Sequence, residues 1–461
     1  MREAQRAGRF VHGQWSSEWM FLLAVFGFVV GLKNVWQFPH HLAMYGGSAF
    51  LLAYLFFLLL FGVPLLMSQI MLGRMGRATP PRVFAKLAPR SRGKRLWVAV
   101  GLMSIAAGFL VLSYYSVVAG WLLAYAARAV TGALDQLTQQ GAESVFTALI
   151  RDPEKQLFWH GLFVLLTVLP LAFPLRRGLE RVVRYGVPAV FVLLFLLVGY
   201  GAGSGAFALG FEYLLRFDLA LLGGDGLLVA LGDAFFSLGL GVATLMMYGA
   251  HLSGQRPLVR TALLVVLVDI GVGLLAGLAV FPVLFAGSTL SAAGPELVFQ
   301  SLTVAYDALP LGGVMRALLF VLLALVAWLS ALGLAEPAVA WLCERHAMTR
   351  TRAVVTVGGA SWLIGVIGIL SLHPWSFSFV LFGVTRTLGL FDVLIVITSF
   401  VLLPLVALGV AVFAGWVLRP ELTREALAID SPCVHDVWLW LNRVVVPVAL
   451  VFVLSGIHLF L

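Results

Sequence analysis

Eleven long apolar stretches divide this chain, and they constrain its fold more than any other feature. A helix of roughly 20 apolar residues crosses the hydrocarbon core of a bilayer. Only 11% of the 461 residues are charged, whereas a soluble protein carries about 25%. The sequence therefore predicts an all-α integral membrane protein with eleven transmembrane helices. The stretches are 17–43, 47–74, 97–130, 157–175, 183–203, 227–251, 258–286, 311–343, 352–372, 389–418 and 434–460.

The connections between these stretches alternate in charge. Most Lys and Arg residues fall in every second connection, and the others hold only scattered basic residues. Cytoplasmic loops are enriched in Lys and Arg, so we expect a multi-pass cell-membrane protein with a cytoplasmic N-terminal tail and a C-terminus outside. Short separate clusters do not make the single basic patch of a nucleic-acid-binding protein. The basic segments are 1–16, 74–96, 176–184, 252–260, 344–352 and 419–432.

Glycines interrupt two of the predicted helices near their middle. The first helix contains GFVVGLKN at 27–34, and the sixth contains FFSLGLGVA at 235–243. Broken helices are tolerated in a membrane where the freed backbone groups line a cavity or bind a ligand. Matching breaks in two halves are typical of inverted-repeat transporters, although glycines also allow close helix packing. We expect five-helix repeats at 17–203 and 227–418 and an eleventh helix at 434–461.

The chain lacks the short motifs of common enzymes. It contains no HExxH metal motif, no phosphate-binding P-loop and no GxSxG nucleophile turn. Its two cysteines, Cys343 and Cys433, exclude a disulfide framework. We therefore expect neither catalysis nor a cofactor.

The segment GLKNVWQFPHHLAMYGGSAFLLAYLFFLLLFGVPLLMSQIMLGR, residues 31–74, resembles the first two helices of the neurotransmitter:sodium symporter family. Trp15, SYY at 113–115, FFSLGLG at 235–241 and LAEPAVAWL at 334–342 match the same family in order. The resemblance covers nearly the whole chain. It implies the leucine-transporter (LeuT-type) fold, a 5+5 inverted repeat with helices 1 and 6 broken, in the eleven-helix form of bacterial members.

The family resemblance also implies where a substrate binds, between the breaks of helices 1 and 6. Gly31 stands where carriers of monoamines place an aspartate, so the resemblance implies an amino acid as substrate. The implied pocket is apolar, which favours an apolar or aromatic amino acid; ordinary core packing is the alternative for each residue. The implied substrate-binding residues are Val29, Gly31, Leu32, Lys33, Val111, Tyr115, Phe236, Ser237, Gly239, Val242, Ala331 and Leu334.

The first sodium site of the family is altered in this sequence. Asn34 fits the family pattern, whereas Lys33 replaces a glycine and Asp269 replaces an asparagine. An ammonium supplies the same positive charge as Na⁺, so we expect a Lys33–Asp269 ion pair that replaces the first sodium. The alternative is a lysine whose stem reaches along the helix to water. Asp269, or Asp233 in place of a neutral glutamine, is a candidate proton carrier.

The second sodium site is weakened by one substitution. The implied ligands are the backbone carbonyls of Gly27, Val30 and Val326 and the hydroxyl of Ser330. Leu329 stands where the family has a second hydroxyl or acid, and an apolar side chain cannot ligate Na⁺. Sodium at these residues is therefore left open.

Both gates of the family differ here. Gln37 occupies the arginine position of the outer gate, and Ile395 occupies its aspartate position. At the inner gate, near Trp15, the basic position corresponds to His12 and the acidic position to Glu344. We expect a remade outer gate, and an inner pair that survives in altered form.

These features predict a secondary transporter of an apolar or aromatic amino acid that works by alternating access, with proton coupling or none. A conventional Na⁺:amino-acid symporter that uses the second site, and a non-transporting amino-acid sensor, are the alternatives. The expected partners are the small-molecule substrate and the lipid bilayer, without nucleic acid, and a homodimer stays open.

Overall fold

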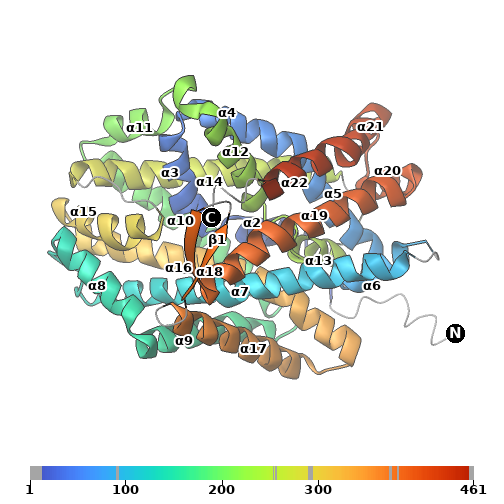
Figure 1. Ribbon diagram of the computed structural model, residues 1–461, viewed down its shortest axis with the longest axis horizontal. Coiled ribbons are helices and arrows are strands. Elements are labelled where there is room, and N and C mark those ends of the chain that lie inside the picture. Colours follow the sequence, from blue (N-terminus) through green and yellow to red (C-terminus); the bar gives the residue numbers. More distant parts are fainter. Residues whose placement is uncertain are drawn as a thin grey trace.

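The computed structural model describes residues 13–89, 93–252, 254, 257–288, 294–372, 376–381 and 384–455. Within these ranges the chain is almost entirely helical, and its long helices run mostly along the longest axis of the molecule (Figure 1). The elements are α2 (Glu18–Val29), α3 (Leu32–Met44), α4 (Ser48–Phe57), η1 (Leu58–Gly62), α5 (Val63–Gly76), α6 (Pro80–Leu87), α7 (Lys94–Val130), α8 (Gln139–Arg151), α9 (Pro153–Leu171), α10 (Leu179–Ala202), α11 (Phe207–Leu215), α12 (Leu219–Ser237), α13 (Thr244–Ala250), α14 (Leu258–Ala286), η2 (Leu297–Ser301), α15 (Leu302–Ala305), η3 (Tyr306–Ala308), α16 (Gly312–His346), α17 (Arg350–Ser371), β1 (Ser376–Leu381), β2 (Val384–Gly389), α18 (Leu390–Val396), η4 (Ile397–Leu402), α19 (Leu403–Val412), η5 (Phe413–Val417), α20 (Pro420–Leu427), α21 (Pro432–Trp440), η6 (Leu441–Val445) and α22 (Val446–Ser455).

The membrane-length helices agree with the predicted architecture. In the described part of the chain, nine helices are long and apolar enough to cross a membrane, or ten when the bent pair α2 and α3 counts as one span. The helix α9 supplies the remaining predicted span with 19 residues. Its first turn carries Glu154, Lys155 and Gln156, whose polarity lowers its mean hydropathy.

Several short elements between the spans were not predicted. The helices α6, α8, α11, α15 and α20 lie in connections, and β1 and β2 form an antiparallel hairpin in which Ser376 pairs with Gly389. Of the predicted N-terminal tail, residues 1–12 lie outside the described residues.

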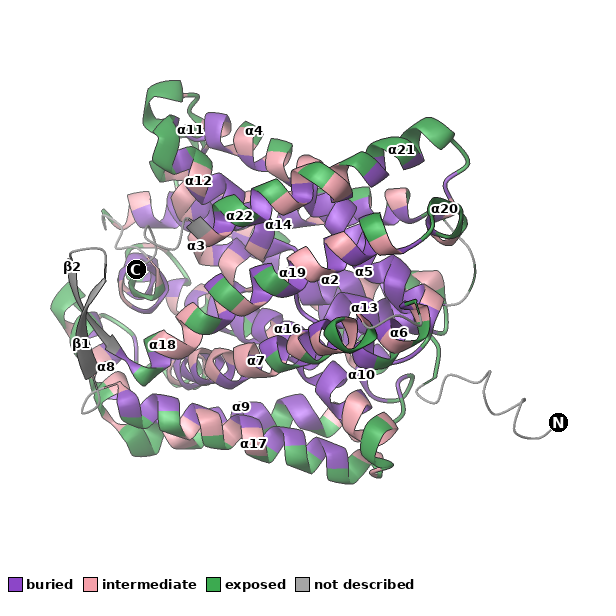
Figure 2. Ribbon diagram, turned by 45° about the vertical axis from the view of Figure 1, so that its right-hand side comes forward, coloured by how far each residue is buried: buried purple, intermediate pink, exposed green. Residues whose placement is uncertain are grey.

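Burial divides the helices into an inner and an outer set (Figure 2). The helices α5, α13 and α16 are mainly buried, whereas α9, α17 and α22 each expose an apolar face. Leu165, Leu363 and Val448, for example, are exposed. A contiguous exposed apolar surface of this kind suits lipid rather than water.

Both predicted breaks are present. α2 and α3 meet at Val30 and Gly31 with a bend of 57°, and the amide of Gly31 donates to Asn34 Oδ1 at 3.1 Å. α12 and α13 are separated by residues 238–243, where Gly239 and Gly241 have φ of 61° and 86°. Only glycine adopts such backbone angles without strain, so the glycines of FFSLGLGVA create the second break.

Candidate functional site

A cavity of about 450 Å³ lies between the two helix breaks. α2, α3 and α12 contribute their broken ends, and α7, α16, α18, η4 and α19 supply the remaining wall. Eleven of the twelve predicted substrate-site residues line it; Ala331 is fully buried in α16 and does not. The predicted lining residues are Val29, Gly31, Leu32, Lys33, Val111, Tyr115, Phe236, Ser237, Gly239, Val242 and Leu334.

One side of the cavity is polar. The first-turn N–H groups of α3, at Leu32 and Lys33, have no carbonyl one turn earlier in their own helix, as at every helix N-terminus. Across from them on α7, the buried hydroxyl of Tyr115 has no hydrogen-bond partner among the described residues. A buried hydroxyl without a partner is costly, so this pair of features suits an anionic ligand group.

The opposite side of the cavity is mainly apolar, and part of it was missed from sequence. Val111 and Val242 were predicted, whereas Phe400 and Leu403 also line the cavity. These two residues lie in the predicted span 389–418, and nothing in its uniformly apolar sequence indicates which of its faces points inward. Tyr114 was also missed; its hydroxyl lies 3.3 Å from Ser399 Oγ.

Lys33 pairs with Asp233, not with Asp269. Its Nζ lies 2.7 Å from Asp233 Oδ1 and 5.1 Å from the centre of the Phe236 ring. The other carboxylate oxygen of Asp233 lies 2.8 Å from His41 Nδ1. The side chain of Asp233 is 2% exposed and that of Lys33 is 20% exposed, so the ion pair is nearly buried at the edge of the cavity.

Asp269 is satisfied by neutral donors instead. Asn34 Nδ2 donates to Asp269 Oδ1 at 2.7 Å, and the hydroxyls of Tyr54 and Ser237 donate to Oδ2. Adjacent residues of a helix point about 100° apart, so when Asn34 faces α14, Lys33 faces α12. The predicted Lys33–Asp269 ion pair was therefore wrong in its partner.

At the predicted second sodium site, Ser330 contacts the first break. Its hydroxyl lies 3.2 Å from the carbonyl oxygen of Val30 and 3.3 Å from that of Phe28. Leu329 packs against Gly27, since a Cβ added at that glycine would lie 3.6 Å from Leu329 Cβ. Val326 is buried one turn earlier in α16. No cluster of three metal-binding His, Cys, Asp or Glu side chains occurs among the described residues.

The predicted gate residues lie at two levels. Gln37 and Ile395 both line the central cavity. At one end of the bundle, Trp15 donates from Nε1 to the carbonyl oxygen of Tyr248 at 3.1 Å. Glu344 accepts from Arg82 at 2.7 Å and from the amide of Thr79 at 2.9 Å. The predicted basic partner of Glu344, His12, lies outside the described residues.

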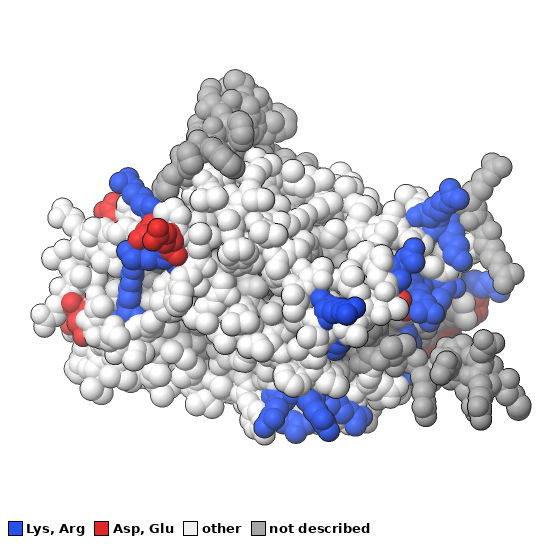
Figure 3. Space-filling model, turned by 90° about the horizontal axis from the view of Figure 1, so that it is seen from below, with Lys and Arg blue, Asp and Glu red and all other residues white. Residues whose placement is uncertain are grey.

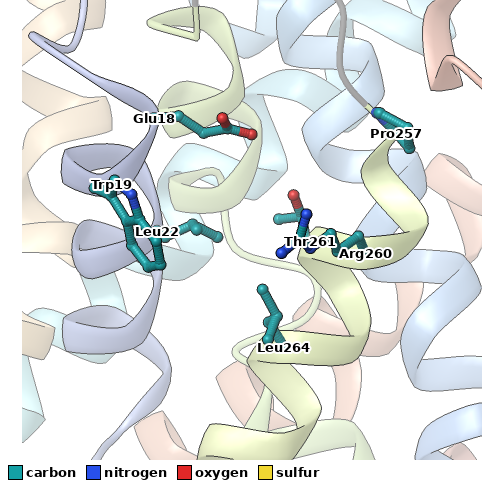
Figure 4. A pocket seen from close by; sticks show the side chains of 7 residues that line it. All are labelled: Glu18, Trp19, Leu22, Pro257, Arg260, Thr261 and Leu264. Atoms are coloured by element: carbon teal, nitrogen blue, oxygen red, sulfur yellow. The ribbon is translucent and has the colours of Figure 1, made fainter.

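A second, smaller cavity of about 200 Å³ lies between the first turns of α2 and the start of α14 (Figure 4). Trp19, which is 68% exposed, and Leu22 face Leu264 across it. This cavity does not reach either helix break, so the central cavity is the candidate site.

Comparison with known proteins agrees with this architecture. The chain matches the Sodium:neurotransmitter symporter family over residues 12–142 and 156–455. It is 33% identical over 443 residues to the uncharacterized sodium-dependent transporter YhdH of Bacillus subtilis (strain 168), covering 95% of this chain and 96% of that one. An uncharacterized sodium-dependent transporter of Haemophilus influenzae is 28% identical over 446 residues, covering 95% and 96% of the two chains.

A solved structure gives the same result for the fold. The crystal structure of MhsT in complex with L-phenylalanine has a TM-score of 0.85 and 33% sequence identity, and covers 97% of this chain and 100% of that one. Membrane-length helices and a cavity between two broken helices define a multi-pass membrane transporter with the LeuT-type fold. The chain belongs to the Sodium:neurotransmitter symporter family, which is a family of transporters and not of enzymes.

Proposed function

We propose that this protein transports an apolar or aromatic amino acid across the membrane by alternating access. The observation that supports this best is the unpartnered Tyr115 hydroxyl in the cavity, opposite the N-terminus of α3. A carboxylate would accept hydrogen bonds from Tyr115 and from the amides of Leu32 and Lys33, where the helix dipole also favours an anion. The amine would meet carbonyl groups at Val29 and Phe236, where α2 and α12 end.

The rest of the cavity fits an apolar side chain. Val111, Val242, Leu334 and Phe400 line it, and about 450 Å³ lies within the usual range for a small-molecule site. MhsT, the similar structure, is named as a complex with L-phenylalanine. Phenylalanine is therefore the first substrate to test.

We further propose that Lys33, next to Asn34 on α3, provides a fixed positive charge that takes over the role of the family's first sodium ion from a neighbouring position. Lys33 lines the cavity, and Asp233 holds its ammonium at 2.7 Å. The groups that the family uses for that ion, around Asn34 and Asp269, hydrogen-bond to one another. Breaking such a buried pair would strand the remaining charge, so the pair would stay intact during the transport cycle.

Sodium coupling through the second site is the second candidate. The relatives in B. subtilis and H. influenzae are named sodium-dependent transporters. Ser330 and the Val30 carbonyl, two of the implied ligands, lie 3.2 Å apart. One sodium ion at this site, with the first replaced by Lys33, is consistent with both observations.

We place the N-terminal side of α2 in the cytoplasm. Seen in the space-filling view, basic side chains gather at one end and along the lower edge with few acidic ones, while the other end mixes both signs (Figure 3). Positive charge on one side of a membrane protein is typical of the cytoplasmic side.

Uptake of labelled L-phenylalanine into liposomes that contain the purified protein tests the proposal. We expect saturable phenylalanine uptake, and we expect an inward sodium gradient to increase it. Unlabelled amino acids as small as alanine should inhibit this uptake only weakly. If a pH gradient drives accumulation of phenylalanine in sodium-free buffer, transport is coupled to protons and not to sodium ions. Binding of phenylalanine without any uptake would contradict transport and would indicate a sensor.

A further inference from the structure

A third cavity, distinct from the two described above, lies at the end of the bundle that holds Trp15. It measures about 830 Å³ and forms where three segments meet: residues 13–14, the connection between α9 and α10, and the connection between α16 and α17. We call it the basic pocket. It takes no part in the substrate site described above, and it shares no lining residue with the central cavity.

The basic pocket has three arginines and no acidic residue in its lining. Arg350 is neutralised, because Glu336 lies 2.6 Å from its Nη2. Arg176 donates from Nε to the backbone carbonyl of Gln14 at 3.2 Å, which leaves its charge unpaired. The side chain of Arg177 has no hydrogen bond or ion pair among the described residues. Two exposed guanidinium groups thus face one cavity without a counter-charge among the described residues.

The nearby acid of α10 is already occupied. Glu180 accepts from the amide and hydroxyl of Ser16 and from Arg184 Nη2 at 3.1 Å. Arg176 and Arg177 are both exposed, so an anion from solution or from the bilayer can reach their guanidinium groups.

The surroundings favour a phosphate that is attached to a lipid. Pro174, Leu175 and Met348 form an apolar part of the lining, and Phe173 beside them is 54% exposed. Leu169, one turn earlier on α9, is 49% exposed. An acyl chain lying along this face of α9 would bring its headgroup to the pocket, and arginine forks match phosphate oxygens in geometry.

We propose that the basic pocket binds a phosphate-bearing anion, the headgroup of an anionic phospholipid or a soluble phosphate ester, through Arg176 and Arg177. Basic pockets at the cytoplasmic ends of transmembrane helices are suited to such headgroups. The bound anion stabilises the segment 13–16, which closes this end of the bundle: His251 Nδ1 lies 2.9 Å from the Gly13 carbonyl oxygen, and Trp15 bonds to Tyr248.

The test is thermal unfolding of the full chain in detergent, titrated with short-chain phosphatidylglycerol, phosphatidylcholine or glycerol phosphate. Ligands that bind the folded state raise the unfolding temperature. We expect phosphatidylglycerol to raise it more than phosphatidylcholine does, and Arg177→Gln to weaken the apparent affinity about tenfold. A shift from glycerol phosphate of equal size would identify the free ester as the ligand.

Arg419→Gln is the matched control, because Arg419 is exposed and does not line the pocket. It should respond like the wild type. Equal responses of the wild type and Arg177→Gln, or an equal loss in Arg419→Gln, would overturn the proposal. The wild type alone gives an independent check: sodium chloride should diminish the phosphatidylglycerol shift by screening, and a salt-independent shift would contradict the site. None of these readouts involves amino-acid transport.

Discussion

Asp233 lies between two side chains of α3 that carry or can carry positive charge. Lys33 and His41 are eight residues apart, about two turns, and each contacts one oxygen of the same carboxylate. The arrangement joins α3 to α12, so one half of each broken helix is linked to the other by charge.

Replacing Lys33 with methionine should destabilise the protein because Asp233 then stays buried beside His41 alone. We expect the free energy of unfolding to fall by about 3 kcal/mol, the lower end of the range for breaking a buried pair, since Lys33 is 20% exposed. Chemical denaturation in detergent measures this. The matched variant Lys33→Met with Asp233→Asn should recover much of the loss, and equal loss in both would contradict the pairing.

Tyr115 offers a second residue-scale prediction. Its hydroxyl has no hydrogen-bond partner among the residues that the structure describes, so Tyr115→Phe should barely change folding stability while it weakens phenylalanine binding about tenfold. Equilibrium binding of labelled phenylalanine measures the effect. Tyr125→Phe is the control, because that buried hydroxyl also has no partner but lies outside the cavity. Unchanged affinity in Tyr115→Phe would remove the hydroxyl from the proposed carboxylate site.

At the scale of elements, the second break depends on glycine at two positions. A Cβ at Gly239 would lie 2.5 Å from the Phe28 ring, and one at Gly241 would lie 2.4 Å from the Leu403 carbonyl oxygen. Both residues also have positive φ. The backbone of the second break is therefore accessible to glycine at these two positions and strained for any other residue.

Gly239→Ala should destabilise the protein by about 1–3 kcal/mol, through the strained backbone and the contact with Phe28, and should reduce phenylalanine binding. Gly271→Ala is the control. No atom lies within 4 Å of a Cβ at Gly271, so alanine there should leave stability unchanged or raise it by about 0.5–1 kcal/mol. Thermal unfolding compares the two, and a neutral Gly239→Ala would contradict the account of the break.

Elements were predictable from sequence to different degrees. The spans follow from the length of apolar runs, and the breaks follow from glycine spacing. The hairpin of β1 and β2 and short helices such as α8 and α11 escaped prediction because connections carry no membrane-length pattern. The partner of Lys33 escaped for another reason: it depends on the rotation of α3, which places Asn34 toward α14 and Lys33 toward α12.

At the scale of the whole molecule, the central cavity is lined by residues beside the two helix breaks and by residues far from the breaks in sequence. Residues beside the two breaks were predicted together because the family resemblance places them there. The wall from η4 and α19, including Phe400 and Leu403, was missed, since a uniformly apolar helix does not indicate its inward face. The central claim is that Lys33, fixed by Asp233, replaces one of two sodium ions that couple to the substrate.

The sodium dependence of phenylalanine binding tests that claim most directly. Labelled phenylalanine is titrated at increasing sodium concentration, with choline as the replacement ion, in the wild type and in Lys33→Gly with Asp233→Gln. This double variant restores the family's glycine and glutamine at these two positions and keeps Asp269. The account predicts that phenylalanine binding by the wild type depends on sodium concentration without cooperativity, as for a single ion. It predicts that the double variant binds phenylalanine more weakly at low sodium and that its binding rises more steeply, and cooperatively, with sodium concentration. A cooperative two-ion response in the wild type, unchanged in the double variant, would contradict it.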